Sequence, residues 1–273
     1  IPEVGHRFRD LRALINGLDC RRRLPQIEVA RGDDAVALVF RHLDPLSPAD
    51  QDALVAFCRE NGLQCYLQPG NESTVHRVWP EEGEERLYYR HPQADVEMAF
   101  HPSDFTQVNA EINRRMVPLA LDLLEVEAHH QVLDLFCGVG NFALALARAG
   151  ASVVGIEGSE EMVARAQENA RKNRLDAVHF LPADLSKPLE MSAAPQRYTA
   201  ALLDPPRDGA DQLVADLAAM GVARILYISC NPATLARDAG ILAGKGYTLV
   251  RAGIMDMFPQ TAHVEAMALF RRQ

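Results

Sequence analysis

The sequence has no apolar run near the roughly 18 residues that a membrane-spanning helix needs. Its first residues, Ile-Pro-Glu-Val-Gly-His-Arg, lack the apolar core of a secretory signal. An initiating Met is also missing, which favours a fragment or a processed product. From these absences we expect a cytoplasmic protein without a membrane partner.

Cysteine is sparse and its spacing is irregular. The five cysteines form no CxxC pair and no even framework; they are Cys20, Cys58, Cys65, Cys137 and Cys230. This pattern argues against disulfide bonds and favours reduced thiols, and we expect no metal site.

Positive charge is in deficit. The chain carries 28 Lys and Arg against 37 Asp and Glu, a net charge of −9, and its pI is near 5.5. This balance argues against a strong electrostatic grip on nucleic acid, unless basic residues cluster locally or another segment supplies the affinity. Arg21–Arg23 and Arg114–Arg115 are candidate phosphate contacts, although solvated surface charge is the simpler interpretation.

What remains is an ordinary globular composition, with 48% hydrophobic residues and a mean hydropathy of −0.12, over 273 residues. That length suits one large domain or two of moderate size. Residues 1–101 read as a small mixed α/β domain, with a helix at 6–18, a hairpin at 26–40 and a helix that Ser47 caps and Gly62 ends.

Residues 102–273 alternate between helices and buried strands, which predicts a mostly parallel sheet covered on both faces, with ligands at the carboxyl ends of its strands. The expected strands are 131–136, 152–157, 177–182, 199–204, 223–229, 247–253 and 263–270. The expected helices are 110–124, 141–149, 159–173, 211–219 and 232–243.

The segment Val132-Leu-Asp-Leu-Phe-Cys-Gly-Val-Gly-Asn-Phe-Ala143 combines a strand, a glycine turn and a helix start. Gly138 and Gly140 lack the Cβ atoms that would keep a ligand from the backbone. The next strand ends in Glu157, whose carboxylate can accept both hydroxyls of a ribose. The pattern predicts a nucleotide-type cofactor, whereas a ligand-free tight turn is the alternative.

S-adenosylmethionine is favoured over NAD for this site. The Asp-x-Phe-x-Gly-x-Gly turn resembles the first motif of class I methyltransferases, which commonly hold the adenine amino group with an acid placed like Asp184. A dehydrogenase would also need its own acid–base and hydride-acceptor site, and the sequence offers no candidate.

Leu-Leu-Asp204-Pro205-Pro206-Arg207 is a second motif at a strand end. The prolines make a rigid turn that holds the carboxylate at the rim of the sheet. Amino-methylating enzymes follow a similar turn with an aromatic residue, so Arg207 argues against adenine N6 as the target. A purely structural proline turn is the alternative.

Leu226-Tyr-Ile-Ser-Cys230-Asn-Pro232 is the third motif. It places a cysteine between a buried strand and a helix start, where the helix N-terminus should help to stabilise a thiolate. A lone cysteine is more often inert core, but the neighbouring methyl-donor motifs favour a nucleophile. Glu265, at the start of the last strand, is a candidate general base, and we interpret His263 as structural.

These residues fit one chemistry. Uracil C5 is a weak carbon nucleophile, and addition of the Cys230 thiolate to C6 would push electrons into the ring. After methylation a base such as Glu265 must remove the C5 proton. A uridine in folded RNA must also flip out of its stack to reach the pocket.

The motifs resemble the RNA (uracil-C5)-methyltransferases, above all their bacterial members that modify 23S rRNA. The resemblance covers nearly the whole chain and is strongest from residue 105 onward, as in Ser229-Cys-Asn-Pro-Ala-Thr-Leu-Ala-Arg-Asp238 and Met255-Asp-Met-Phe-Pro259. It implies 5-methyluridine as the product, Cys230 as nucleophile and Glu265 as base. It also implies that the methyl donor is held by Gln107, Phe136, Asn141, Glu157, Asp184 and Asp204.

The sequence departs from this family in two respects. Family members begin with a TRAM domain that helps to bind RNA, and they hold a [4Fe–4S] cluster through cysteines upstream of the position that matches Ile1. We therefore expect the cluster only in a full-length family protein and not in this chain. The expected partner is 23S rRNA, and no obligate protein partner is evident. The resemblance also implies that the small domain at 1–101 contacts the RNA and that residues 102–273 form the catalytic methyltransferase domain.

Two rival interpretations stay open. An RNA cytosine-C5 methyltransferase usually carries its catalytic cysteine beside the proline turn, where this chain has only Asp204-Pro-Pro. An idle RNA-binding module that kept the fold is the other rival, against which the intact Cys230, Glu265 and glycine turn argue.

Overall fold

The computed structural model describes residues 2–189 and 198–273 and divides into two compact units. The first unit contains Ile1–Tyr89 and Ala99–Asp104, and the second contains Arg90–Met98 and Phe105–Gln273. The assignment of separate domains at 1–101 and 102–273 stays a prediction. None of the described helices is both long enough and apolar enough to cross a membrane.

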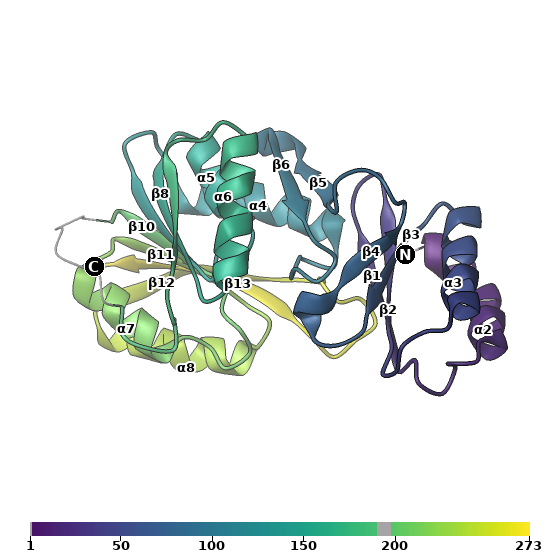
Figure 1. Cartoon of the computed structure of the whole chain (residues 1–273). Coiled ribbons are helices and arrows are strands. Elements are labelled where there is room, and N and C mark those ends of the chain that lie inside the picture. The colour runs from purple at the N-terminus through teal and green to yellow at the C-terminus, as the bar shows by residue number, and fades with distance from the viewer. Residues whose placement is uncertain (1, 190–197) are drawn as a thin grey trace. The chain divides into compact units, whose positions relative to one another are not determined.

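The first unit is built on a four-stranded sheet in the order β1-β2-β3-β4 (Figure 1). Its strands are β1 (Gln26–Arg31), β2 (Val36–Arg41), β3 (Gln64–Gln68) and β4 (His76–Trp79). The predicted hairpin is the antiparallel pair β1–β2, whereas β2 and β3 are parallel and joined through helix α3. The short helices of this unit are α1 (Pro2–Gly5) and η1 (Glu72–Thr74), and the longer ones are α2 (Phe8–Gly17) and α3 (Pro48–Glu60). The short helix η2 (Pro92–Ala94) belongs to the second unit.

Local sequence sets both ends of helix α3. The Ser47 Oγ accepts a hydrogen bond of 3.1 Å from the Asp50 amide, and Gly62 leaves the helix with φ of +66°. Buried side chains from α2, α3 and the strands form the core, among them Leu11, Leu54 and Phe40. The strands β5 (Leu87–His91) and β6 (Val96–Phe100) form a separate two-stranded sheet.

The second unit contains a seven-stranded sheet in the order β12-β13-β11-β10-β7-β8-β9. The strands are β7 (Gln131–Leu135), β8 (Ser152–Glu157), β9 (Val178–Pro182), β10 (Ala200–Leu203), β11 (Arg224–Ser229), β12 (Tyr247–Met255) and β13 (Glu265–Arg272). Neighbours from β9 to β11 pair in parallel, and β13 runs antiparallel to both β11 and β12. The predicted mostly parallel sheet is therefore confirmed.

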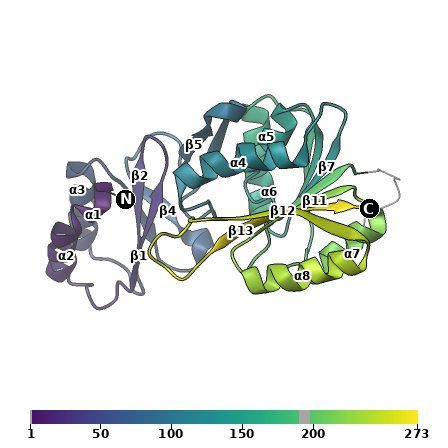
Figure 2. The ribbon, with the colours of Figure 1, turned by 180° about the vertical axis from the view of Figure 1, so that it is seen from behind.

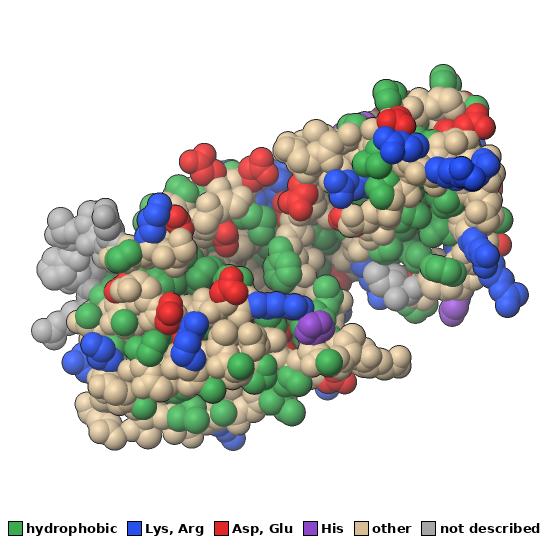
Figure 3. All heavy atoms as spheres, turned by 90° about the horizontal axis from the view of Figure 1, so that it is seen from below, with side chains coloured by type: hydrophobic (Ala, Val, Ile, Leu, Met, Phe, Trp, Pro, Cys, Tyr) green, Lys and Arg blue, Asp and Glu red, His purple; other side chains and the backbone are tan. Residues whose placement is uncertain are grey.

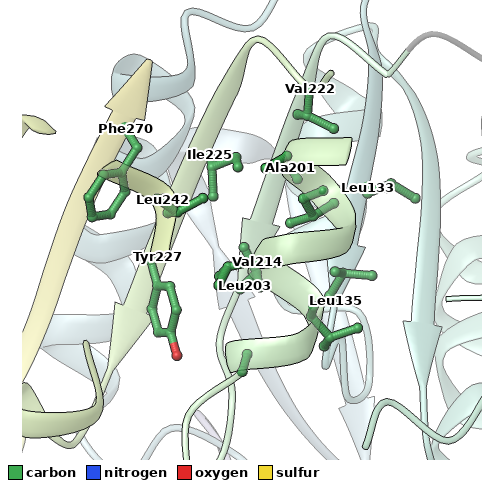
Figure 4. Close-up of a cluster of buried hydrophobic side chains, with 14 of the residues drawn as sticks. Leu133, Leu135, Ala201, Leu203, Val214, Val222, Ile225, Tyr227, Leu242 and Phe270 are labelled. Atoms are coloured by element: carbon green, nitrogen blue, oxygen red, sulfur yellow. The ribbon is translucent and has the colours of Figure 1, made fainter. Parts of the chain in front are cut away.

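Helices cover both faces of this sheet (Figures 1 and 2). They are α4 (Ala110–Leu124), α5 (Ala143–Arg148), α6 (Glu160–Lys172), α7 (Asp211–Met220) and α8 (Pro232–Gly244), with α4, α5 and α6 on one face and α7 and α8 on the other. Alternate strand residues such as Leu133 and Leu135 point to α7 and α8, where they pack with Val214 and Leu242 (Figure 4). Because successive strand residues face opposite sides, this core fixes which residues line each face.

Strand register aligns the carboxyl ends of the parallel strands at one edge. Leu135 of β7 lies beside Leu203 of β10 and Ile156 of β8, and Leu203 lies beside Tyr227 of β11. The antiparallel β13 starts at the same edge, since its Ala266 is opposite Ser229. Residues that follow β7, β8, β10 and β11, or that begin β13, are therefore brought together.

Candidate active site

The carboxyl edge of the second unit gathers most of the predicted site residues. Phe136 follows β7, Glu157 ends β8, Asp204 follows β10, Cys230 follows β11 and Glu265 begins β13. The prediction that β13 starts at residue 263 was wrong by two residues. His263 therefore lies in the loop before Glu265 rather than on the strand.

The glycine turn after β7 has an unusual backbone. Phe136, Gly138 and Gly140 have φ angles of +62°, +54° and +96°. Phe136 is a bulky residue in the left-handed region, where the backbone stores strain that tends to be kept at functional sites. A Cβ added at Gly140 would lie 3.2 Å from the side chains of Leu144 and Phe180, so this turn requires glycine.

Glu157 is fixed by the turn that it faces. Its Oε2 accepts a 3.1 Å hydrogen bond from the Gly138 amide, and its Oε1 accepts one of 3.1 Å from the Ser159 amide. A carboxylate has further lone pairs to offer, so these two bonds orient the group and leave it able to accept from a ligand's hydroxyls.

Asn141 belongs to a polar network that the sequence analysis missed. Its amide exchanges two hydrogen bonds of 3.0 Å with Asn113 of α4, and its Oδ1 lies 2.9 Å from His91 Nε2. The available signal was Asn113 itself, a polar residue on the inward face of α4 with Met116 and Val117. The network holds Asn141 in place from outside the glycine turn.

Carboxyl groups crowd the centre of the site. Gln107 Nε2 donates a 2.9 Å hydrogen bond to Asp204 Oδ2, which brings two predicted donor-binding residues into contact. Burial raises the pKa of Asp204 to about 7, although the Gln107 hydrogen bond acts in the opposite direction. Behind it, Asp134 is fully buried in β7, and burial together with the Asp204 charge raises its pKa well above the ordinary range.

Asp184 lies apart from this crowded group. It is exposed in the loop after β9, where its Oδ1 accepts hydrogen bonds of 2.6 Å and 3.0 Å from the Ser186 hydroxyl and amide. Lys187 Nζ lies 2.9 Å from its Oδ2. The Ser186 and Lys187 contacts lower the pKa of Asp184 to about 2, so this carboxylate is charged and solvated.

Cys230 sits in a tightly bonded turn between β11 and α8. The Ser229 Oγ and the Asn231 backbone form two 3.0 Å hydrogen bonds across it, and Asn231 Oδ1 caps α8 by accepting from the Ala233 amide at 3.1 Å. The predicted helix start directly after the cysteine is therefore present, with Pro232 in its first turn.

We expected the helix N-terminus to favour the Cys230 thiolate, but other effects on the pKa of this thiol are larger. Burial and then the Glu265 charge raise the pKa of the Cys230 thiol, and Asp204 adds to the effect. Arg207 acts in the opposite direction without reversing it. In the ligand-free protein the thiol is therefore protonated at neutral pH.

Glu265 is a buried carboxyl, only 3% exposed. Burial and then the charge of Asp204 raise its pKa to about 7. An acid with this pKa can release and accept a proton near neutral pH, which is the property that a general base requires.

The loops that carry Asp204 and Cys230 are joined through the backbone. The Arg207 carbonyl accepts hydrogen bonds of 3.0 Å from Asn231 Nδ2 and 3.2 Å from Thr234 Oγ1. The guanidinium of Arg207 lies 3.2 Å from His263 Nε2, in the loop before Glu265. Three segments distant in sequence are thereby held around the thiol.

Asp238, a residue that the sequence did not single out, is hydrogen-bonded to the elements that carry the Asp204 and Cys230 loops. It is fully buried, and its Oδ2 accepts hydrogen bonds of 2.6 Å from the Tyr227 hydroxyl and 2.8 Å from the Ala210 amide. Its Oδ1 accepts from Arg237 Nε at 2.8 Å. This carboxylate ties β11, α8 and the loop after Asp204 together.

Among the described residues, Glu127, His129 and His130 have ligand atoms close enough to share a metal ion. They precede β7 and so lie at the amino edge of the sheet, opposite the site. The Arg224 guanidinium lies 3.4 Å from His130 Nε2, and such a cation disfavours metal binding there.

The family model described as tRNA (uracil-5-)-methyltransferase matches residues 85–273. The chain belongs to this family. Over its whole length it is 60% identical to the 23S rRNA (uracil(1939)-C(5))-methyltransferase RlmD of Alcanivorax borkumensis and 54% identical to that of Alkalilimnicola ehrlichii. The chain spans 61% of the length of each of these relatives.

Solved structures of this family and fold agree with the architecture. The tRNA (uracil-54, C5)-methyltransferase of Pyrococcus abyssi, solved with S-adenosyl-L-homocysteine, has a TM-score of 0.71 and 27% identity. That comparison covers 89% of this chain and 58% of the other. TYW2 of M. jannaschii, at 14% identity and a TM-score of 0.58 over 90% of this chain and 100% of the other, shares the fold alone. The predicted fold, that of the S-adenosylmethionine-dependent methyltransferases, is confirmed.

Proposed function

We propose that this chain is the catalytic part of an enzyme that transfers a methyl group from S-adenosylmethionine to C5 of a uridine in 23S rRNA. The relatives named above support the substrate, and the structure with S-adenosyl-L-homocysteine supports the donor. The observation that carries the proposal is the position of Cys230 and Glu265, which lie at the same sheet edge as the glycine turn.

The site suits a cationic methyl donor. Burial raises the pKa values of Asp134, Asp204 and Glu265, and the charge of Asp204 raises those of Asp134 and Glu265 further. A sulfonium cation would offset this concentration of negative charge. The glycine turn leaves room beside the backbone, and Glu157 is oriented to accept from ribose hydroxyls. The residues that we propose to hold the donor are Gln107, Phe136, Gly138, Asn141, Glu157, Asp184 and Asp204.

When bound, S-adenosylmethionine supplies an electrophilic methyl group. Cys230 prepares the uracil for it, because addition of the thiolate to C6 moves the ring electrons onto C5 and O4. The raised pKa of Cys230 means that its proton must be removed during this step. Arg207 favours the thiolate, and the proton of this partly exposed thiol leaves to solvent, so that the Glu265 carboxylate remains ionised for the later step.

Glu265 acts after the methyl transfer. Once C5 carries the methyl group, its remaining proton must leave before the C–S bond can break, and we assign its removal to the Glu265 carboxylate. Loss of this proton restores the C5–C6 double bond and expels the Cys230 thiolate. The burial of Glu265 keeps competing water away from this proton transfer.

The substrate imposes further requirements. The target uridine must leave its stack to reach the buried thiol, so we propose a flipped nucleotide. On the molecular face seen in Figure 3, Lys and Arg are interspersed with Asp and Glu. We therefore assign RNA contacts to local sites, including the small domain at 1–101, rather than to a broad basic surface. We propose the cytoplasm, where ribosomal RNA would be available, as the location.

The test uses an RNA fragment that contains 5-fluorouridine at the target position, incubated with the protein and S-adenosylmethionine. Because fluorine cannot leave C5 as a proton does, the Cys230 adduct should persist and appear by mass spectrometry. Cys230→Ala should give no adduct, and Cys20→Ala, which removes another partly exposed thiol, should behave as wild type. An adduct that survives Cys230→Ala would assign the nucleophile elsewhere, for instance to Cys137.

A further inference from the structure

The first unit contains a cavity of about 330 Å³ at the end of β2 and β3. This volume lies within the range of small-ligand sites, roughly 300–1,000 Å³. The walls are largely apolar, with a few polar side chains among them. The lining residues that matter here are Leu43, Leu46, Leu67, Pro69, His42 and Gln51.

His42 supplies this cavity with a buried polar group. The side chain is 7% exposed, and its Nδ1 lies 2.8 Å from the Asp44 carbonyl oxygen. Because a carbonyl only accepts hydrogen bonds, Nδ1 carries a proton, and in the neutral ring Nε2 is an acceptor. Among residues 2–189 and 198–273, Nε2 has no hydrogen-bond partner. Nε2 is covered, so the N–H group of a ligand can reach it only if the ring or the cavity wall shifts, and such a contact would then supply the missing donor.

Positive charge lies at the rim of the same cavity. Arg21, Arg22 and Arg23 are consecutive and exposed, and the Leu43 amide donates a 2.9 Å hydrogen bond to the Arg23 carbonyl. The Arg23 guanidinium makes a two-point contact with Asp44, at 2.6 Å and 3.1 Å. Arg23 is therefore committed to the rim itself. Arg21 and Arg22 directly precede it in the chain, and the Arg21 guanidinium donates a 3.3 Å hydrogen bond to the Leu18 carbonyl.

We propose that this cavity holds one unpaired base of the RNA substrate, distinct from the target uridine, while Arg21 and Arg22 contact its neighbouring phosphates. A nucleobase combines flat apolar faces with an N–H edge, which matches the leucine and proline walls and the His42 acceptor. The arginines supply the complementary charge in a chain whose net charge is −9. This inference rests on the proposed function for the nature of the RNA.

The base contact is tested by filling the cavity from an exposed position. Gln51 is an exposed α3 residue that lines the cavity, and Ala49 is an exposed α3 residue outside the lining. In a Cys230→Ala background, which prevents covalent capture, Gln51→Trp should weaken binding of a fluorescein-labelled 23S rRNA fragment about tenfold, the scale of one stacked base. Ala49→Trp should bind as the parent, and anisotropy titration measures both.

His42→Ala should weaken binding in the same direction as Gln51→Trp without changing the salt dependence, since no phosphate contact is lost. Because His42 is buried, its variant needs a thermal melt beside the titration, and Gln51→Trp keeps the test valid if that variant unfolds. Gln51→Trp binding within twofold of Ala49→Trp would overturn the base-binding cavity.

The phosphate contacts have a separate signature. Arg21→Gln with Arg22→Gln should reduce the slope of log K against log salt by about 1.4, at roughly 0.7 for each contact to a single strand. Arg9→Gln with Arg12→Gln removes the same charge from exposed positions of α2 and should leave the slope unchanged. Equal slopes in the two double variants would refute the role of Arg21 and Arg22.

Two further outcomes separate this inference from the proposed function. If Gln51→Trp weakens RNA binding and the wild-type protein forms no adduct, the base-binding role of the cavity stands and the proposed Cys230 mechanism is rejected. If the wild-type protein forms the adduct and Gln51→Trp binds RNA normally, the Cys230 mechanism stands and the base-binding role of the cavity is rejected. Calorimetric binding of free adenosine or uridine monophosphate in the cavity, without an effect on RNA binding, would reassign it to a small nucleotide and overturn the proposal.

Discussion

Replacing Glu265 by Gln should stabilise the folded protein at pH 8 while it disables catalysis. The wild-type carboxyl is 3% exposed, and burial and then the charge of Asp204 raise its pKa from 4.5 to about 7. The ionised form is therefore disfavoured in the native state. Gln keeps the shape of Glu and has no charge to bury.

The sign and the size follow from the two pKa values. Well below pH 4.5 the carboxyl is protonated in both the folded and the unfolded chain, so it contributes nothing. As pH rises towards 7, only the unfolded chain gains from ionisation, and above 7 the full difference of about 3 kcal/mol opposes folding. At pH 5 the destabilisation that the raised pKa of Glu265 causes is less than about 1 kcal/mol.

Thermal unfolding followed by circular dichroism measures this effect. The Tm advantage of Glu265→Gln should grow between pH 5 and pH 8 to roughly 6–12 °C, at about 2–4 °C per kcal/mol. Glu60→Gln, at an exposed position at the end of α3, is the matched control and should show no such trend. A Glu265→Gln protein no more stable than wild type at pH 8 would refute the argument that the ionised Glu265 carboxylate destabilises the folded state.

Three further outcomes are expected. Resolution of the methylated adduct should accelerate as pH rises through about 7, where Glu265 loses its proton, and Glu265→Gln should trap the adduct in a single-turnover assay. Gly140→Ala should weaken S-adenosylmethionine binding at least tenfold by calorimetry, because φ is +96° there and a Cβ meets side chains at 3.2 Å, whereas Gly158→Ala meets no atom nearer than 3.9 Å. Asp238→Asn should lower the free energy of unfolding by about 2 kcal/mol in urea, since a buried carboxylate that accepts three hydrogen bonds loses its charge.

The sequence was sufficient to predict the sheet and the edge that carries the site. Alternating strands and helices implied parallel pairing, and the carboxyl ends of parallel strands share one edge. That rule alone placed Glu157, Asp204 and Cys230 near one another, and the register agrees with it. The boundary of the last strand was missed because polar His263 and apolar Val264 do not mark where pairing begins.

The electrostatics of the site could not be read from the sequence. Position at a helix start predicted a stabilised Cys230 thiolate, but the pKa depends on how closely Glu265 and Asp204 approach and how little water remains. The amide pair of Asn141 and Asn113 likewise depends on how α4 packs beside the glycine turn. These properties arise from contacts between residues far apart in the chain, which periodicity does not encode.

The bond from Asn231 to residue 207 has a practical consequence, because it ends on a backbone carbonyl and not on the arginine side chain. Any amino acid at position 207 retains that carbonyl. Side chains of different charge can therefore be exchanged there to vary the electric field at the Cys230 sulfur while the two loops keep their spacing. The site thus allows the nucleophilicity of the sulfur to be tuned while the hydrogen bond between its two loops is kept and only the Arg207 side-chain contact with His263 is lost.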